Sequence, residues 1–488
     1  MRLAVRHFAL VALLALLAGC STIVTSEKQK RPMMEQFIGG QAESALQLAQ
    51  KKHDSTEGKG DELVWLLECG SLQFYLGDYK GALASFRRCE ALIEEYDERA
   101  LVSLQDTGNE ALTVLSNDNA LPYRGWCRDR VALGIYKSLA YLGLNNEQGF
   151  RAQVKRMRGE HQKILEDYQK FFEAEQARLE EAKSKNEEVA KKAYSKDYLN
   201  DPRNQAFLQD MAATEEVAHR GYGNFLNPAS LFLSALSLLR DGEWDNARIE
   251  FSHLYQAMPA NATVKQYYVT ALRNSRRDIP AALKGVKPFD FPLDRDCVYV
   301  LFAHDLTASF EQRLIYFPLM FAWPVCVFHP AMLNSLTVEG GGHSCTAVPL
   351  ADMDGILAQE FSRRMPARLT RTLISALIKE AGYIATMAAL DRSDNGGSSK
   401  AVLKLSTAVA WKTYQAMFNT ADTRGWFLLP KEICLAQLPM PSSRKLTLRG
   451  LPSENQIELP ENCGSAIVYV NAMTPAKIQC QVFPLPNH

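Results

Sequence analysis

The residues best suited to chemistry in this 488-residue chain lie in two short segments between positions 304 and 345. His304 is followed by an aspartate that can orient its imidazole, while His343 and Cys345 come directly after the glycine turn 340–342. Backbone N–H groups of such a turn can stabilise an oxyanion, so hydrolysis by an envelope enzyme is one hypothesis. A nucleophile needs its base across space, however, and the chain has no G-x-S-x-G elbow. We therefore keep a site around His304, His343 and Cys345 as the alternative and predict a chain without catalytic residues.

Other chemistry has even less support in the sequence. The cysteines form no C-x-x-C pair, and the histidines show no paired-ligand spacing, so we expect no metal. There is no Walker loop and no G-x-G-x-x-G before a helix, so we expect no cofactor. Lysine plus arginine and aspartate plus glutamate both number 55, which leaves no net field to favour nucleic acid. The sequence thus favours a non-enzymatic protein.

The N-terminus has the features of a lipoprotein signal peptide over residues 1–19. Arg2 and Arg6 form a basic region, and the apolar run Phe8–Leu17 is too short to span a bilayer. The run ends in Leu-Ala-Gly before Cys20, whose thiol would take the lipid, so the mature chain would begin there. Ser21 follows, rather than an aspartate that would retain the protein at the inner membrane. We expect an outer-membrane lipoprotein that faces the periplasm and meets the membrane through its anchor only.

Two helical segments share one pattern of small, acidic and aromatic residues. In each, a small residue precedes a Gly-acid-aromatic turn, and an alanine and a phenylalanine follow the turn. The packing residues are Gly70, Tyr79, Ala82 and Phe86 in the first copy and Ala235, Trp244, Ala247 and Phe251 in the second. The pattern resembles the tetratricopeptide repeat, in which small residues let two helices approach closely. A third segment near 132–154 departs from the spacing and is not counted.

The remaining organisation follows from composition. Residues 20–35 are polar and predict a tether, residues 36–277 a TPR-like helical domain, and residues 278–295 a proline-marked linker. A seam from Phe150 to Phe171, followed by a run rich in Glu and Lys, predicts a long charged helix at about 150–200 that projects into solvent. Residues 296–420 predict a mixed α/β domain and 421–488 a β-rich end. Nine cysteines remain after Cys20; for Cys463 and Cys480, which flank a predicted hairpin, both a disulfide and two free thiols stay open.

Within the mixed domain, Val298–Phe302 reads as a central strand without alternation, which predicts burial on both faces. Pro366 is expected to interrupt the helical pattern, and a helix from Ala367 then carries one apolar stripe, Leu369–Ile384. That helix would cover one face of the sheet. A helix at 402–418, the terminal strands or a partner would cover the other.

The order of several motifs across the mature chain resembles an uncharacterised family of bacterial TPR-like lipoproteins. The motifs are Asn227-Pro228, the strand Val298–Phe302, Asp352-Met353-Asp354, Arg363–Arg371 and Asp422–Trp426 with Leu429-Pro430. Residues 303–307 depart from the Asn-Gly-x-x-Pro turn associated with the family. The resemblance implies an outer-membrane lipoprotein and supplies no catalytic residues.

The sequence therefore predicts an α plus α/β fold, in which a TPR-like helical solenoid precedes a mixed α/β domain that ends in short strands. For function it favours a non-catalytic, lipid-anchored periplasmic adaptor. Such a scaffold would bind unidentified envelope proteins through its helical groove, in a setting such as cell-envelope assembly.

Overall fold

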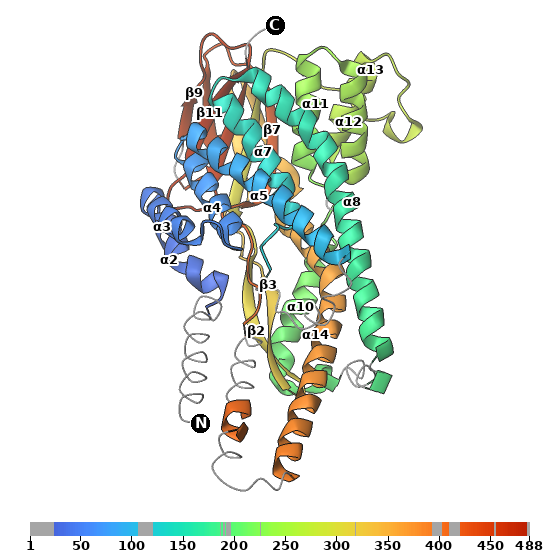
Figure 1. Ribbon diagram of the computed structural model, residues 1–488. Helices are drawn as coiled ribbons and strands as arrows, with labels where there is room; N and C mark the ends of the chain where they lie inside the picture. Colours follow the sequence, from blue (N-terminus) through green and yellow to red (C-terminus); the bar gives the residue numbers. More distant parts are fainter. Residues whose placement is uncertain are drawn as a thin grey trace.

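In a computed structural model, the described residues are 24–105, 121–185, 187–188, 191, 197–224, 226–317, 319–392, 403–408, 420–452 and 455–485. The expected signal peptide with Cys20, the loop 394–399 and most of the expected 402–418 helix lie outside these residues. Helices occupy the N-terminal part of the described chain, and strands arranged in several sheets dominate the C-terminal part (Figure 1). The fold is therefore of the α+β type.

Four helical hairpins account for most of the helical part of the described chain. They are α2 (Ser26–Ile38) with α3 (Ala42–Thr56), α4 (Glu62–Tyr75) with α5 (Tyr79–Gln105), α7 (Cys127–Gly143) with α8 (Glu147–Lys185), and α11 (Pro228–Arg240) with α12 (Trp244–Ala257). Helices α10 (Gln205–Ala218) and α13 (Ala262–Asn274) and short 3-10 turns at Asp197–Asn200, Pro202–Asn204 and Ala281–Leu283 complete this part.

All four hairpins close with the same backbone turn. One residue of each turn has a positive φ: Gly40 at 80°, Gly77 at 82°, Asn145 at 53° and Gly242 at 73°. In the second hairpin, Gly77 N–H donates to the Phe74 carbonyl and the next N–H to the Gln73 carbonyl, which is a Schellman motif. The segment near 132–154, left out of the repeat count, thus forms the same hairpin, because asparagine tolerates this conformation.

A five-stranded sheet lies at the centre, in the order β11-β10-β1-β7-β6. Its strands are β1 (Cys297–Leu306), β6 (Val348–Asp352), β7 (Pro430–Pro439), β10 (Ser465–Ala472) and β11 (Gln479–Leu485). Strand β1 pairs in parallel with β10 and antiparallel with β7. The prediction that the strand at Val298 is central is confirmed.

Both faces of β1 are buried, and this chain covers each of them. Tyr299 and Leu301 belong to the core shared with the helices, whereas Val298, Val300 and Phe302 pack in a second core. The second core lies against a four-stranded sheet in the order β5-β4-β8-β9. Its strands are β4 (Thr337–Gly340), β5 (His343–Thr346), β8 (Lys445–Arg449) and β9 (Asn455–Glu458). Of the expected covers, the terminal strands are observed in part: β8 and β9 belong to this sheet, and β4 and β5, which lie earlier in the chain, complete it.

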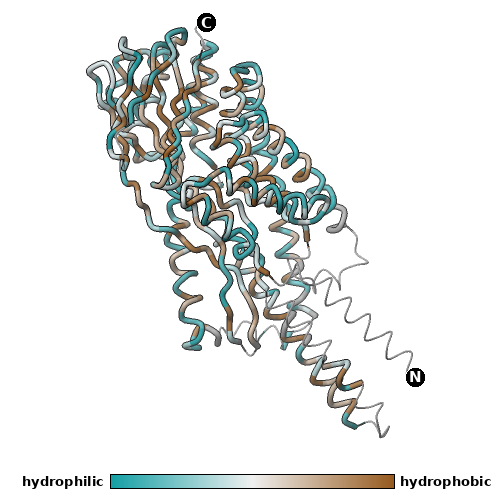
Figure 2. The backbone as a smooth tube through the Cα atoms, turned by 90° about the vertical axis from the view of Figure 1, so that its left-hand side faces the viewer, coloured by the Kyte–Doolittle hydropathy of each residue, from teal (hydrophilic) through white to brown (hydrophobic). Residues whose placement is uncertain are grey.

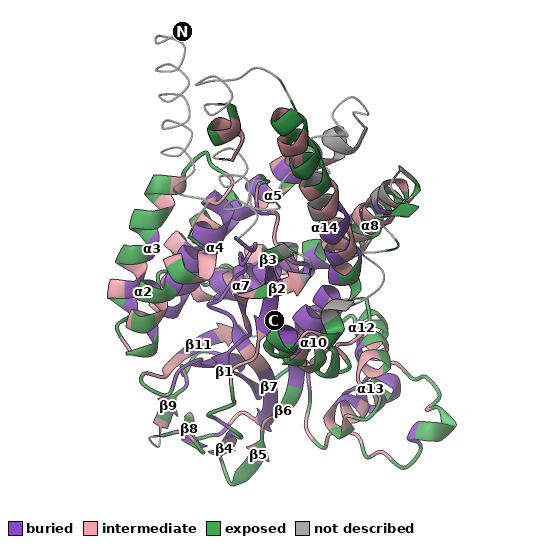
Figure 3. Cartoon of the chain, turned by 90° about the horizontal axis from the view of Figure 1, so that it is seen from below, coloured by how far each residue is buried: buried purple, intermediate pink, exposed green. Residues whose placement is uncertain are grey.

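The first helices of three hairpins pack directly on the helix-facing side of this sheet. The ring centroids of Phe74 (α4) and Tyr136 (α7) lie 5.6 Å and 6.5 Å from that of Tyr469 on β10. Phe232 on α11 lies 6.0 Å from Tyr299 on β1. Buried residues accordingly gather where these helices meet the strands (Figure 3). The inner face of the hairpins, where an open groove was expected, is filled by the sheet.

Helix α14 (Met353–Arg392) corrects the prediction that Pro366 interrupts the pattern, since Pro366 lies inside one continuous helix. Because Pro366 has no N–H, the helix lacks the backbone hydrogen bond to the Ser362 carbonyl but continues past it. The stripe that begins at Leu369 packs on α8 and α10 rather than across the sheet, because other helices already cover that face. Ile384 near its far end is 58% exposed, and Figure 2 shows hydrophobic stretches along this projecting part.

Two further expectations are corrected at the periphery. The tether predicted for 20–35 ends early, because α2 begins at Ser26 and buries Lys30, Met33 and Phe37 on one face. The charged run of α8 does not project alone, since Glu175 pairs with Arg368 of α14 at 2.7 Å. A separate hairpin, β2 (Ser309–Phe317) with β3 (Leu319–Val327), extends beside α10 (Figure 1). In the described residues, no helix combines the length and hydrophobicity that a membrane span requires.

Candidate functional site

The repeat-packing residues lie at helix–helix contacts. A Cβ atom added at Gly70 would come within 2.3 Å of the Phe86 ring, so only glycine fits this crossing. Ala82, Ala235, Ala247 and Phe251 are fully buried. Tyr79 packs on Gly143 of the next hairpin, and Trp244 is partly buried against the shared core. These side chains hold the helical layer together.

The residues of the alternative catalytic site, His304, His343 and Cys345, do not form one site in the structure. His343 is exposed at the start of β5, and the Cys345 thiol donates to the Thr346 carbonyl. His304 is buried near the end of β1, where its Nδ1 lies 2.9 Å from an Asp305 carboxylate oxygen. Its Nε2 faces Glu432 and Cys434 on β7, two residues that sequence reasoning missed.

Cys463 and Cys480 are free thiols in the structure, as are the other described cysteines. The hairpin register places Cys480 opposite Val470, near the turn, whereas Cys463 precedes the far end of β10 at Ser465. The equal arms needed for a bridge are therefore absent, and of the two alternatives the free thiols are the one observed.

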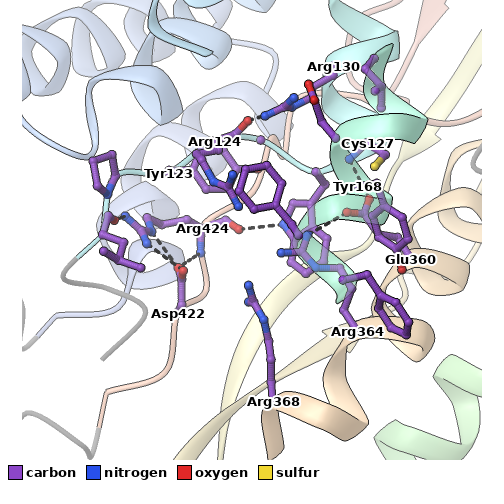
Figure 4. Close-up of a pocket in the computed structure, with 18 residues that line it drawn as sticks. Tyr123, Arg124, Cys127, Arg130, Tyr168, Glu360, Arg364, Arg368, Asp422 and Arg424 are labelled. Carbon is purple, nitrogen blue, oxygen red and sulfur yellow. Dashed lines mark hydrogen bonds and ion pairs between the residues drawn. The ribbon is translucent and has the colours of Figure 1, made fainter. Parts of the chain in front are cut away.

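A pocket of about 120 Å³ opens where the loop 121–126, α8, α14 and the segment 422–424 meet (Figure 4). Aromatic and arginine side chains dominate its lining. The residues are Leu121, Pro122, Tyr123, Arg124, Gly125, Trp126, Cys127, Arg130, Ile164, Asp167, Tyr168, Phe171, Phe172, Glu360, Arg364, Arg368, Asp422 and Arg424. Of these, Arg364 and Arg368 belong to the motif Arg363–Arg371 noted in the sequence, and Asp422 and Arg424 belong to Asp422–Trp426. The pocket that brings the two motifs together was not predicted.

The loop that forms one wall is fixed by buried polar contacts. Tyr123 donates its hydroxyl hydrogen to the Asp129 carboxylate, and the Cys127 N–H donates to Glu360 of α14 at 2.7 Å. The Trp126 ring stacks on Phe310, with centroids 5.0 Å apart. Because three elements hold this wall, its arginines are presented from a rigid backbone.

Most of the pocket arginines have a carboxylate of their own. Arg130 makes a two-pronged pair with Asp97 at 2.7 and 2.8 Å. Arg364 donates to Glu360 at 2.9 Å, and Arg368 pairs with Glu175. These pairs account for the burial of so many cations, because a buried charge needs a partner.

Arg424 belongs to the Asp422–Trp426 motif and is also paired. Its guanidinium contacts Asp422 at 2.8 Å and Asp61 at 3.2 Å. Burial alone would lower its pKa, but these carboxylates raise the pKa above its ordinary value. Trp426 is fully buried and donates its indole N–H to Ser71 at 2.8 Å. This segment is thus a buried, extended loop whose arginine is paired.

Arg124 is the exception among these arginines. Its nearest carboxylate is Asp97, at 3.5 Å, and Asp97 is already engaged by Arg130. Its guanidinium lies over the Phe171 ring. The pKa of Arg124 is lowered to about 10, mainly by burial; Asp97 opposes this shift, and the neighbouring Arg130, Arg364 and Arg368 contribute to it. Arg124 therefore shares its nearest carboxylate with a second arginine, Arg130, instead of being paired one to one.

The comparisons with known proteins find no relative of this chain. No protein-family model, no curated protein and no solved structure matches it.

Proposed function

We propose that this protein is a non-catalytic adaptor, lipid-anchored through Cys20 at the periplasmic face of the outer membrane, that binds an anionic group of an envelope protein in the arginine pocket. The observation that carries the binding part is Arg124, a partly buried cation that shares its carboxylate with a second arginine. A carboxylate or phosphate in the pocket would supply the missing counter-charge. The planar guanidinium suits either group, since both accept paired hydrogen bonds.

The location of the pocket also supports a binding role. With the inner face of the hairpins filled by the sheet, that face leaves no room for a peptide, and the pocket lies elsewhere, between α8 and α14. Leu121, at its rim, is 53% exposed and offers an apolar contact beside the charge. An acidic side chain or a C-terminal carboxylate of a partner would fit this combination. A TPR-like origin of the hairpins remains part of the proposal, supported by Gly70, Ala235 and the shared turns.

The anchor proposal rests on the N-terminal sequence and on the short distance between Cys20 and α2. Five residues lie between Cys20 and Ser26, which corresponds to at most about 20 Å of extended chain. A lipid at Cys20 would hold the folded body close to the bilayer, where partners of the envelope are within reach.

The test is a titration of the detergent-extracted native lipoprotein with inorganic phosphate and with a short acidic peptide, read as thermal stabilisation. Wild type should be stabilised by at least one of the two, and Arg124→Met should lose the effect. Arg277→Met is the matched control, because Arg277 is 58% exposed and pairs with Asp245 on the outer surface. Equal stabilisation of wild type and Arg124→Met would refute the pocket as the binding site.

A further inference from the structure

A second cluster, separate from the arginine pocket, lies where β1 and β7 pair. His304 comes from β1, and Glu432 and Cys434 come from β7, with His304 opposite Glu432 and Phe302 opposite Cys434. Because side chains alternate along a strand, these three project to the same face of the sheet. One potential ligand atom from each lies within 4.8 Å of the other two. Sequence reasoning predicted no metal here, because the histidine and the cysteine are 130 positions apart and show no paired-ligand spacing.

The spacing of the ligand atoms matches a tetrahedral metal site. Nε2 of His304 lies 3.3 Å from a Glu432 carboxylate oxygen and 3.6 Å from the Cys434 sulfur. Zinc bonds of about 2.0–2.1 Å to nitrogen or oxygen and about 2.3 Å to sulfur, at tetrahedral angles, separate N from O by roughly 3.4 Å and N from S by roughly 3.6 Å. Both separations from the imidazole nitrogen therefore suit a single ion, and the Glu432 oxygen and the Cys434 sulfur lie within 4.8 Å of each other.

Asp305 supplies the support that a metal-binding imidazole requires. Its carboxylate lies 2.9 Å from His304 Nδ1 and also accepts the N–H groups of Met332 at 3.0 Å and Leu333 at 3.4 Å. A proton held on Nδ1 leaves the Nε2 lone pair directed at the cluster. Asp305 has a φ of 54°, an uncommon conformation for a residue other than glycine, and it is almost fully buried. The chain thus keeps this carboxylate beside the ring at a conformational cost.

Burial and charge favour the same conclusion. His304 and Cys434 are buried, and Glu432 keeps 28% of its side chain exposed, so an ion would enter from the glutamate side. One thiolate and one carboxylate together neutralise a divalent cation. Mixed nitrogen, sulfur and oxygen ligands are typical of zinc rather than of magnesium or calcium.

We propose that His304 Nε2, Glu432 and Cys434 bind one Zn²⁺ ion, with Asp305 orienting the imidazole and water at the fourth position. The competing arrangement is metal-free: a protonated His304 would bridge Asp305 and Glu432, beside a neutral Cys434 thiol. The two arrangements differ in the state of Cys434, which is a thiolate only when it holds the metal. The proposal does not depend on the arginine pocket.

The test uses the full-length lipoprotein, stripped with a chelator, reloaded with ZnCl₂ and dialysed, with bound zinc measured by mass spectrometry. Wild type should retain one zinc per chain, and the control Cys480→Ser should match it because Cys480 lies on β11, at the opposite edge of the sheet. Cys434→Ser should lose stoichiometric zinc, and Asp305→Asn should weaken binding 10–100-fold in competition with a chromophoric chelator. Wild type without zinc, or Cys434→Ser with unchanged affinity, would overturn the proposal.

A measurement on wild type alone keeps the test decisive if a variant fails to fold. Loading with Co²⁺ in place of zinc should give a thiolate-to-cobalt charge-transfer band and tetrahedral d–d bands. Zinc should also protect Cys434 from alkylation, as read by peptide mass spectrometry, and leave the labelling of Cys480 unchanged. A cobalt spectrum without the thiolate band would favour the metal-free arrangement and reject the site.

Discussion

The guanidinium carbon of Arg124 lies 3.7 Å from the centre of the Phe171 ring. Three features offset the cost of partly burying the Arg124 charge: this stacking, the carboxylate of Asp97 that it shares with Arg130, and a partly exposed edge. Cation–π contacts stabilise by about 0.5–2 kcal/mol, which is less than a buried charge usually needs. We therefore expect the charge of Arg124 to reduce stability, as the proposed anion site would require.

The first prediction follows from that imbalance. Arg124→Met keeps the contact with Phe171 and removes the charge, so we expect a higher melting temperature than wild type in buffer without anions. The usual effect of deleting a paired buried arginine is the reverse. Arg130→Met is the internal comparison: it removes the two close hydrogen bonds to Asp97 and leaves that carboxylate only the 3.5 Å contact with Arg124, so we expect it to lower the melting temperature. An Arg124→Met variant less stable than wild type would contradict the charge imbalance.

The second prediction concerns pH. The pKa of Arg124 is about 10 in the folded chain, below its ordinary value of 12.5, so the cation is fully present at neutral pH and is lost as pH rises through 10. The cost of burying it is present in full below pH 10 and is relieved above. Anion stabilisation should therefore be constant from about pH 8 to 9, where phosphate is already the dianion, and should fall toward pH 10.5. The check is phosphate titration by differential scanning fluorimetry at each pH, with Arg124→Met as the baseline.

How far the sequence predicts the fold is best seen at the hairpin turns. Gly77 and Gly242 mark their turns because glycine adopts positive φ without cost, and the packing residues follow at fixed spacing. In the third hairpin the residue with positive φ is Asn145. Asparagine predicts such a turn less strongly than glycine does, so this hairpin was not counted as a repeat. Lys30 was assigned to a tether because a lysine in a polar run reads as solvent-exposed, and its partner Glu68 lies a whole hairpin later.

The functional candidates were less predictable because their parts come from distant segments. Parallel pairing of β1 with β10 sets Val298 beside Ala466, and no local pattern reveals that pairing or the filling of the groove. His304-Asp305 was noted as an oriented imidazole, and that part is observed. Its neighbours on β7 could not be inferred without knowing the register.

The third prediction tests the closest helix crossing. Gly70→Ala places a methyl group 2.3 Å from the Phe86 ring and should cost about 1–3 kcal/mol of unfolding free energy. Gly159→Ala is the matched control, since Gly159 also lies inside a helix and no atom is within 4 Å of its would-be Cβ. That control should stabilise by about 0.5–1 kcal/mol. Denaturant unfolding measures the change in unfolding free energy for both variants. Equal changes in the two would refute the tight crossing at Gly70.

The fourth prediction concerns the enclosed ion pair of Lys30 and Glu68, whose side chains are both fully buried. Glu68 also accepts the backbone N–H groups of Phe427 and Leu428, at 2.9 and 3.0 Å. Lys30→Met leaves this carboxylate without its cation and should cost about 3–5 kcal/mol. Lys28→Met changes an exposed lysine on the same helix and should be nearly neutral. Adding Glu68→Gln to Lys30→Met should recover part of the loss; no recovery would mean that packing, not charge, dominates here.

The last prediction addresses the anchor. Cys20→Ser removes the thiol that would take the lipid, so the precursor should remain unprocessed and the mature, lipidated form should be lost from outer-membrane fractions. Because the packed helix α2 begins only at Ser26, the same substitution should leave the fold intact. The melting temperature of the Cys20→Ser chain, purified in the same detergent, should therefore equal that of wild type. Fractionation with globomycin treatment, metabolic palmitate labelling and a thermal melt provide the three readouts. A mutant that still labels with palmitate and fractionates like wild type would show that another segment holds the protein at the membrane.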